Sequence, residues 1–388
     1  MQAIVVGGGI VGLTSAYYLS SRGVEVTVLE KSSIGAGATE RAAGGIRAQF
    51  ETPVSINLSK ASIDVWERYE TTFETDIGYQ QPGYLFLARS DDTAAALRES
   101  VAIQNECGVP SEFITPERAA VYSPAIDPDN YVGGTYSPTD GYADPHLALR
   151  GFAEAASDAG VEVQTGVEVT DVVRTQDEDG PVSGVETSEG DKTADYVVNA
   201  AGAWGAQIAA MAGIDIPITP HRRQIIIVDP ATPVQDTVPM TFDYGLSLYF
   251  HPNREGAILL GGRFTETDEP ADPDTYATDV DFDTGATALE RASDFADYFG
   301  PNARIKRGWA GLYATTPDYH PVIEETVPGF INAVGFSGHG FMQAPATGQL
   351  VAELVVDGTA SLVDISELRN ERFEHGDLLY DMHGERYG

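Results

Sequence analysis

The amino-acid sequence predicts an α/β fold in which a first domain with a parallel sheet is interrupted by a second, α+β domain with a mixed or antiparallel sheet. Three observations support this prediction. A glycine-rich turn joins a strand to a helix at the start of the chain, strand patterns dominate the middle, and a glycine-rich strand–helix pattern returns near the end. A chain of 388 residues is long enough for two domains of about 150 residues or more each.

The first third of the chain alternates strands and helices. Residues 3–6 are apolar and predict a buried strand, and the helix after them ends near Arg22 with Gly23 as its C-cap. A second strand covers 24–29 and ends at Glu30, before a loop of small residues. Further helices are expected over 54–75, 92–106 and 145–160, with a strand over 83–88.

The middle of the chain predicts a β-meander of three short strands, 161–165, 168–174 and 182–187, followed by a strand over 195–199. Two more strands, 222–228 and 257–262, indicate a second sheet, and the acidic segment 268–284 is interpreted as a solvated surface loop. A strand over 329–334 and a helix over 344–357 complete the pattern.

These elements predict a discontinuous domain organisation. The polar end of the chain, 374–388, is expected to be disordered or to contact a partner. The first domain is assigned residues 1–78, 138–217 and 307–360, the second 79–137 and 218–306, and the C-terminal tail 361–388.

The charge of the chain excludes several classes of partner. It carries 23 Lys and Arg against 59 Asp and Glu, a net charge of −36. A nucleic-acid binder needs a basic surface, and an anionic membrane surface repels so acidic a protein.

Only four residues are lysines, namely Lys31, Lys60, Lys192 and Lys306. Few lysines and many carboxylates favour a halophilic protein, because the charge screening length falls to ~3 Å in 1 M salt; an acidic mesophilic protein is the alternative.

Other residue counts limit the chemistry further. Cys107 is the single cysteine, which excludes an internal disulfide, and the histidines show no paired spacing for a metal site. The sequence has no basic leader and no uninterrupted apolar run of 18 residues, so we expect a cytoplasmic protein without membrane insertion.

The glycines of Gly7-x-Gly9-x-x-Gly12 follow the first strand and open the first helix, as in a Rossmann-type dinucleotide-binding domain. Gly7 permits the tight turn, Gly9 lets the backbone approach a pyrophosphate at the helix N-terminus, and Gly12 lets the helix pack closely on the strand. Glu30, at the end of the second strand, can accept hydrogen bonds from ribose hydroxyls and repels a 2′-phosphate. The motif alone leaves FAD and NAD open.

Two further motifs narrow the choice between FAD and NAD. The run DYVVNAAGAW covers 195–204, and GFSGHGF covers 335–341, with APATG at 344–348. With these motifs in this order, the sequence resembles the FAD-dependent superfamily of D-amino-acid, glycine and sarcosine oxidases from Val5 to about Phe373. The segment ATERAAGGIR at 38–47 is most similar to the sarcosine oxidase and dimethylglycine dehydrogenase branch.

The resemblance implies FAD contacts in several separate segments of the chain. They comprise the glycine turn, the residues after the second strand, the small-residue loop, the 195–204 motif and the glycine-rich loop before the last helix. The implied residues are Gly7, Gly9, Ile10, Val11, Gly12, Glu30, Lys31, Ala38, Thr39, Gly44, Gly45, Glu168, Ala201, Gly202, Trp204, Gly311, Gly338, His339, Gly340, Phe341 and Met342.

The resemblance also implies a substrate side. Arg47 matches the arginine that binds the substrate carboxylate in sarcosine oxidases, and its planar donors suit a carboxylate. Tyr249 and Tyr313 match tyrosines of the substrate pocket. Arg263 stands where the family has a histidine, and His339 lies in the flavin loop. The helix that follows favours negative charge on the flavin during reduction.

Three departures from the family pattern change the expected chemistry. Met342 replaces a lysine that helps to hold the carboxylate, and Leu259 replaces the lysine that activates oxygen. The cysteine that attaches flavin covalently corresponds to Gly311. We therefore expect non-covalent FAD and a dehydrogenase rather than a fast oxidase.

The expected activity is oxidation of the C–N bond of a secondary or tertiary amine or amino acid, such as sarcosine, dimethylglycine, proline or a D-amino acid. The resemblance implies hydride transfer to flavin N5 and hydrolysis of the imine. One alternative is a 2-hydroxy acid dehydrogenase that uses His251 or His339 as its base; another is a flavin-bearing subunit of a larger complex. The electron acceptor and the choice between homo- and hetero-oligomer stay open.

Overall fold

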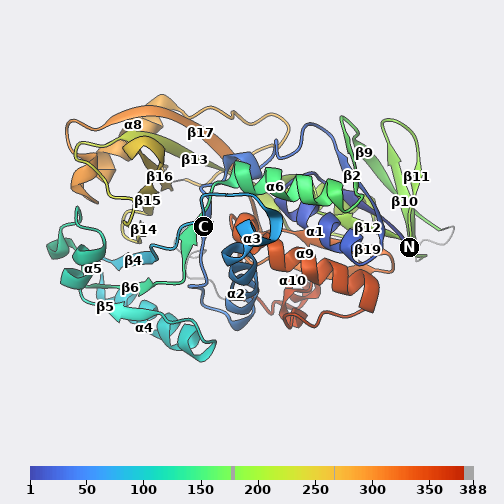
Figure 1. Cartoon of the computed structure of the whole chain (residues 1–388), viewed down its shortest axis with the longest axis horizontal. Coiled ribbons are helices and arrows are strands. Elements are labelled where there is room, and N and C mark those ends of the chain that lie inside the picture. The colour runs from blue at the N-terminus through green and yellow to red at the C-terminus, as the bar shows by residue number, and fades with distance from the viewer. Residues whose placement is uncertain (176–179, 266, 380–388) are drawn as a thin grey trace.

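The computed structural model describes residues 1–175, 180–265 and 267–379, and it contains two large sheets that lie side by side along the long axis of the molecule (Figure 1). The predicted α/β fold class is confirmed. The six-stranded sheet lies at the right of Figure 1, near the N-terminus, and the eight-stranded sheet lies at the left.

The six-stranded sheet is parallel except at one edge, where β18 runs antiparallel to β19. Its first strand carries buried residues on both faces. Ala3 and Val5 pack with helices on one side, and Ile4 and Val6 pack with a small β-meander and α7 on the other. The strand order is β18 (Val322–Val327), β19 (Phe330–Val334), β12 (Tyr196–Asn199), β1 (Gln2–Val6), β2 (Glu25–Glu30) and β8 (Glu162–Thr165).

The meander contains different strands from those expected. The predicted strand 161–165 is β8, which pairs in parallel with β2 and so belongs to the large sheet. The prediction of a meander from 161–165 was wrong because alternation along a short strand does not say which strand it pairs with. The meander consists of β9 (Val169–Arg174), β10 (Val182–Thr187) and β11 (Lys192–Thr193).

The eight-stranded sheet draws its strands from two separate parts of the chain. All neighbours are antiparallel except β14 and β4, which join the two parts in parallel. The strand order is β17 (Arg304–Thr315), β13 (Thr219–Asp229), β16 (Ile258–Gly262), β15 (Leu248–Pro252), β14 (Met240–Asp243), β4 (Tyr84–Ala88), β6 (Gly133–Ser137) and β5 (Glu112–Ile114). A further two-stranded sheet pairs β3 (Gly45–Ile46) with β7 (Gly141–Tyr142).

Most helices lie where the hydrophobic pattern predicts them, but three predictions need correction. The expected helix over 54–75 is two helices, α2 and α3, which meet at Arg68. The last long helix begins at Gly340 rather than 344, and α8 begins inside the supposed loop 268–284. The helices are α1 (Ile10–Ser21), α2 (Pro53–Glu67), α3 (Tyr69–Phe73), α4 (Asp91–Glu106), α5 (Pro116–Tyr122), α6 (Pro145–Asp158), α7 (Gly205–Met211), α8 (Phe282–Ala292), α9 (Gly340–Asp357) and α10 (Glu371–His375).

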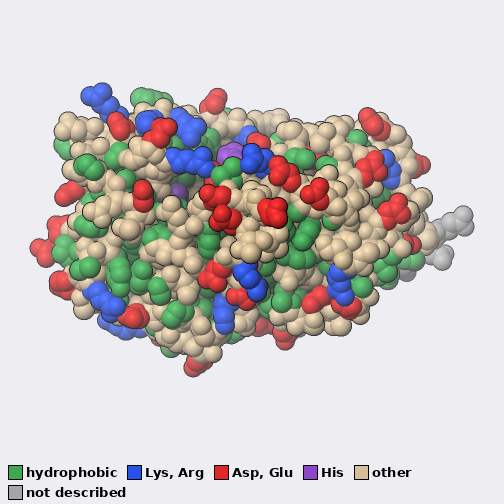
Figure 2. Space-filling view, viewed as in Figure 1, with side chains coloured by type: hydrophobic (Ala, Val, Ile, Leu, Met, Phe, Trp, Pro, Cys, Tyr) green, Lys and Arg blue, Asp and Glu red, His purple; other side chains and the backbone are tan. Residues whose placement is uncertain are grey.

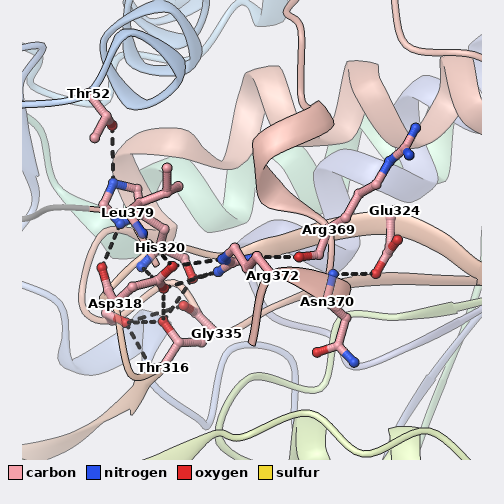
Figure 3. A network of polar contacts seen from close by, with 11 residues as sticks. Thr52, Thr316, Asp318, His320, Glu324, Gly335, Arg369, Asn370, Arg372 and Leu379 are labelled. Carbon is pink, nitrogen blue, oxygen red and sulfur yellow. Dashed lines mark hydrogen bonds and ion pairs between the residues drawn. The ribbon is translucent and has the colours of Figure 1, made fainter. Parts of the chain in front are cut away.

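The segment after α9 packs onto the body of the protein. Arg372 in α10 is 4% exposed, and its guanidinium donates two hydrogen bonds to the buried carboxylate of Asp318, at 2.7 and 3.1 Å (Figure 3). It also donates to the carbonyl of His320. The expected disorder from residue 374 is therefore wrong for Glu374 and His375, which belong to α10, and 380–388 lie outside the described residues.

Acidic side chains lie across the whole width of the face shown in Figure 2. None of the helices in the described ranges combines the length and the apolar character needed to cross a bilayer.

Candidate active site

A cavity of about 610 Å³ lies between the two sheets, within the size range of small-molecule and cofactor sites. Its lining begins directly after the carboxyl ends of the parallel strands, with Gly7 after β1, Lys31 after β2, Ala200 after β12 and Gly335 after β19. Ligands of open α/β sheets bind at this edge. The opposite wall comes from the eight-stranded sheet.

The glycine turn is built as its sequence predicts. Gly7 has φ +110°, and a Cβ there would lie 2.5 Å from the carbonyl oxygen of Ala200. A Cβ on Gly12 would lie 1.9 Å from the carbonyl oxygen of Gly7, so α1 can pack on the turn only with glycine at this position. Gly12 itself does not line the cavity; Gly9 and Ile10 do. The N-terminus of α1 therefore faces the cavity. Its N-cap residue, Gly9, has no side chain, and Thr39 Oγ1 accepts a hydrogen bond from Ile10 N at 3.1 Å.

Glu30 is held in place by two backbone groups. Its Oε2 accepts a hydrogen bond from Gly8 N at 2.8 Å, and its Oε1 accepts one from Ser32 N at 2.8 Å. Each carboxylate oxygen has a second lone pair, so Glu30 can still accept hydrogen bonds from hydroxyl groups in the cavity.

The sequence analysis missed Asp274, which joins two predicted contact residues, Lys31 and Trp204, at this end of the cavity. Lys31 Nζ lies 4.0 Å from the centre of the Trp204 ring, and both side chains donate to Asp274 Oδ1, at 2.7 and 2.8 Å. Asp274 comes from the segment interpreted as a solvated loop. Pro273, Asp274 and Tyr276 line the cavity, so that interpretation is corrected: part of the segment closes the site.

Arg47 lies at the other end of the cavity and is 3% exposed. Its Nη2 lies 3.2 Å from His339 Nε2, and its Nη1 donates to the carbonyl of Gln49. A guanidinium has no acceptor, so His339 Nε2 must be the acceptor and the His339 ring is neutral. The guanidinium carbon also lies 3.8 Å from the centre of the Phe50 ring.

Two buried carboxyl groups support the loop that carries Arg47. Asp140 accepts hydrogen bonds from Ala48 N at 2.9 Å and Gln49 Nε2 at 3.0 Å, and burial raises its pKa to about 6. Burial also raises the pKa of Glu51, to about 7, against the opposing effect of Arg47. Sequence reasoning assigned no role to Asp140 or to Glu51.

The two predicted pocket tyrosines meet in the wall of the cavity. The hydroxyls of Tyr249 in β15 and Tyr313 in β17 share a hydrogen bond, and burial raises the pKa of both above the ordinary value. Both are therefore neutral hydrogen-bonding groups at neutral pH. Further apolar and aromatic lining that the sequence analysis did not identify comes from Tyr84, Phe86, Met240 and Phe242.

His251 and Leu259 lie outside the cavity lining. The ring nitrogens of His251 lie 2.6 Å from the carbonyl oxygen of Pro252 and 3.1 Å from that of Ala43, so neither is directed at a substrate. Leu259 is 3% exposed and packs with Ile225 and Ile227.

The cavity brings the predicted site residues together. Every residue proposed from the sequence as a cofactor or substrate contact lines it, except Gly12. The residues that sequence reasoning missed include arginines, which carry no local motif. Within the described ranges, no group of three His, Cys, Asp or Glu side chains lies in a position to hold a metal ion. The missed residues with charged or aromatic side chains include Arg41, Tyr84, Phe86, Arg223, Phe242, Asp274 and Tyr276.

A glycine turn after β1, an acid at the end of β2 and an aromatic chamber with a buried arginine define a dinucleotide-dependent oxidoreductase site. The chain belongs to the DAO family of FAD-dependent oxidoreductases, whose model matches residues 2–354. The superfamily expected from the sequence motifs is thereby confirmed, and the protein is an FAD-dependent oxidoreductase.

Similar proteins cover nearly the whole chain. The chain is 30% identical to sarcosine oxidase subunit beta of Arthrobacter sp., over 99% of this chain and 93% of the relative. Among solved structures, L-proline dehydrogenase from P. horikoshii has a TM-score of 0.88 and 35% identity, covering 97% of this chain and 99% of that one. Glycine oxidase from Geobacillus kaustophilus has a TM-score of 0.83 and 25% identity, covering 95% and 98%.

Proposed function

We propose that this FAD-dependent oxidoreductase oxidises the C–N bond of a secondary or tertiary amine that carries a carboxylate. The observation that carries the proposal is Arg47, a buried cation that lines an aromatic chamber at one end of the cavity. A desolvated guanidinium binds a carboxylate strongly and in a fixed orientation. The names of the relatives support the same class of reaction, since they include sarcosine oxidase subunit beta and L-proline dehydrogenase.

The cavity fits FAD. The N-terminus of α1, with glycine at its N-cap, suits a pyrophosphate, and the carboxylate of Glu30 suits ribose hydroxyls. At the other end, Gly340 and Phe341 of α9 line the cavity, and the N-cap residue of α9, His339, makes no side-chain cap. It favours negative charge beside it. When bound, FAD supplies the capacity to accept a hydride equivalent from the α-carbon of the substrate.

The residues of the chain provide binding, orientation and a dry environment. Arg47 holds the substrate carboxylate, and His339 and Gln49 hold Arg47. Tyr84, Phe86 and the Tyr249–Tyr313 pair exclude water from the reacting carbon. A substrate amine that binds deprotonated needs no proton acceptor from the protein, which suits a chamber whose tyrosines are neutral.

Two finer proposals follow from single residues. Leu259, which matches the oxygen-activating lysine of the family, is apolar and packs with Ile225 and Ile227, and the loss of that lysine supports a dehydrogenase. Gly311 supports non-covalent FAD. A Cβ at this position would lie 2.9 Å from Arg41 Cβ, so a longer side chain there would require Arg41 to move.

The histidines disfavour the 2-hydroxy acid alternative, which needs a base for the hydroxyl proton. His251 faces two carbonyl oxygens outside the cavity lining, and His339 accepts a hydrogen bond from Arg47 at its Nε2. The other alternative, a flavin-bearing subunit of a larger complex, is favoured by the similarity to a protein named as a subunit. We also propose a cytoplasmic location, the domain limits given from the sequence, and assembly as a homo- or hetero-oligomer.

A product assay tests the proposal. The FAD-loaded protein is incubated with an artificial electron acceptor and with either N-methyl and cyclic amino acids or the matching 2-hydroxy acids. The proposal expects amine or aldehyde products from the first set only. Turnover of the hydroxy acids alone would overturn it, and turnover that requires a co-purified protein would support the complex instead.

A further inference from the structure

A basic cluster of His221, Arg223 and Arg263 surrounds one acid, Asp268, beside the cavity. Arg223 and Arg263 line the cavity directly. The pKa of Asp268 is raised by burial, but the hydrogen bonds and charge of Arg223, with the charges of His221 and Arg263, lower it below its ordinary value overall. All three basic groups therefore lie within electrostatic reach of this one carboxylate.

The sheet places the two arginines side by side. The ladder between β13 and β16 ends with Gln224 opposite Gly262; Arg223 precedes Gln224 in β13, and Arg263 directly follows the end of β16. Like charges at such neighbouring positions repel each other and destabilise the sheet unless an anion lies between them. In a chain with a net charge of −36, two adjacent arginines in a cavity wall favour the binding of a specific anion.

Asp268 forms an ion pair with only one of the two arginines in the described part of the chain. It forms an ion pair with Arg223 through both carboxylate oxygens, and the two side chains are 10% and 13% exposed. Arg263 is different, because its Nε is buried and has no hydrogen-bond partner within the described part of the chain. A buried guanidinium donor without an acceptor is costly, so this position favours a ligand that supplies one.

The cluster faces the same chamber as Arg47. Arg47, Arg223, Arg263 and Tyr313 all line one cavity. The guanidinium carbon of Arg223 lies 5.4 Å from the centre of the Tyr313 ring, and the charges of both Arg223 and Arg47 act on the pKa of Tyr313 against the larger effect of burial. A ligand beside Tyr313 would therefore lie within electrostatic reach of both cationic regions.

We infer that the physiological substrate is an amino acid with a second anionic group, which Arg263 binds while Arg47 holds the α-carboxylate. This inference rests on the proposed function, because it takes Arg47 as the carboxylate site and an amine as the reacting group. It adds the substrate class: an amino acid that carries a second carboxylate or similar anionic group. A monocarboxylate leaves Arg263 Nε without an acceptor.

Matched inert ligands test the inference. Thiodiacetate and (methylthio)acetate differ only by the second carboxylate, and sulfur replaces the amine nitrogen in both. Diacids with a longer second arm extend the series. Dissociation constants are measured by calorimetry on the FAD-loaded protein at one fixed KCl concentration. We expect at least one diacid to bind about 10-fold or more tightly than its matched monoacid, as charge-assisted hydrogen bonds imply.

Variants then locate the preference. Arg263→Gln is expected to reduce the ratio of diacid affinity to monoacid affinity to near unity, and Arg263→Lys is expected to keep part of this preference. Arg307→Gln, which removes an exposed charge from β17 outside the cavity lining, should leave the ratio unchanged. Equal affinity of diacids and monoacids at every arm length overturns the inference, as does a preference that survives Arg263→Gln. Failure of Arg47→Met to weaken either ligand would instead contradict the proposed function.

Discussion

Arg47 Nη2 lies 3.2 Å from His339 Nε2, which joins the cation of the active-site chamber to the residue that precedes α9. The two residues are far apart in the sequence: Arg47 directly follows β3, and His339 comes from the glycine-rich loop after β19. Because Arg47 can only donate, this contact fixes the tautomer of His339 as well as the direction of the guanidinium. The proposed substrate clamp and the N-terminus of α9 are thus joined by a direct contact.

The first prediction concerns this clamp. Arg47→Met is expected to raise KM for a carboxylate substrate by about 100-fold, because a buried charged hydrogen-bonding group is lost. The FAD content should change little, and Arg47→Lys should recover part of the loss because it keeps the charge without the planar fork. Steady-state kinetics and the flavin-to-protein ratio measure both effects. An unchanged KM in Arg47→Met would remove Arg47 from the clamp.

Buried Glu51 predicts a pH-dependent stability difference. Its pKa rises from 4.5 to about 7 on folding, so between these values the native state binds more protons than the unfolded state. The group therefore lowers stability progressively as pH rises through this window. Arg47 and His320 are the charged or titratable groups that act on it.

Glu51→Gln removes this titration. Relative to the parent protein, the variant should become more stable as pH rises from 4.5 to about 7, by up to about 3 kcal/mol, and the difference should stay constant above that. Chemical denaturation at a series of pH values measures it. The exposed control Glu106→Gln should give no such slope, and an identical pH profile for Glu51→Gln and the parent would contradict the assignment.

The ion pair between Arg372 and Asp318 predicts that the C-terminal segment contributes to stability. Arg372→Met leaves the fully buried carboxylate of Asp318 without its partner, which is expected to cost about 3–5 kcal/mol. Denaturation curves of this variant, of Asp318→Asn and of the double variant give the interaction free energy between Arg372 and Asp318. Arg22→Met breaks an exposed pair with Asp357 and should have little effect. If Arg372→Met lowers the free energy of unfolding as little as Arg22→Met does, the buried ion pair does not stabilise the C-terminal segment.

Non-covalent FAD is tested by acid precipitation. Gly311 has no nucleophilic side chain, so the yellow colour should remain in the supernatant after the protein is precipitated. A yellow pellet that withstands washing would show a covalent link through another residue.

The net charge of −36 predicts a dependence on salt. Repulsion among surface carboxylates opposes the compact state, and molar KCl screens it. The thermal melting temperature should therefore rise between dilute buffer and molar KCl. A melting temperature that is the same in both would favour the acidic mesophilic interpretation.

The parts of the site that depend on local chain geometry could be predicted from the sequence. The turn at Gly7 and the acid at Glu30 follow from one strand–turn–helix–strand unit, in which neighbours in sequence are neighbours in space. Arg47 and His339 came from motif resemblance, which placed Arg47 at the substrate carboxylate and His339 in the flavin loop but did not show their contact with each other.

Residues brought together by tertiary structure could not be predicted in this way. Arg223 and Arg263 become neighbours only through the pairing of β13 with β16. Asp268 pairs with Arg223 and Asp274 lines the cavity, and both come from a segment whose composition is typical of solvated loops. The same limit explains β8, whose partner β2 lies far earlier in the chain. Composition and periodicity report how exposed a segment is, and not which element it packs against.

Anaerobic reduction of the bound flavin tests the central claim most directly. The protein is purified in molar KCl, and its absorbance spectrum is recorded before and after addition of a pool of N-methyl, N-carboxyalkyl and cyclic amino acids. If the protein oxidises amines, the visible flavin band is bleached by the pool but not by the matching 2-hydroxy acids. A flavin band that persists with every amino acid and is bleached by a hydroxy acid would contradict the account.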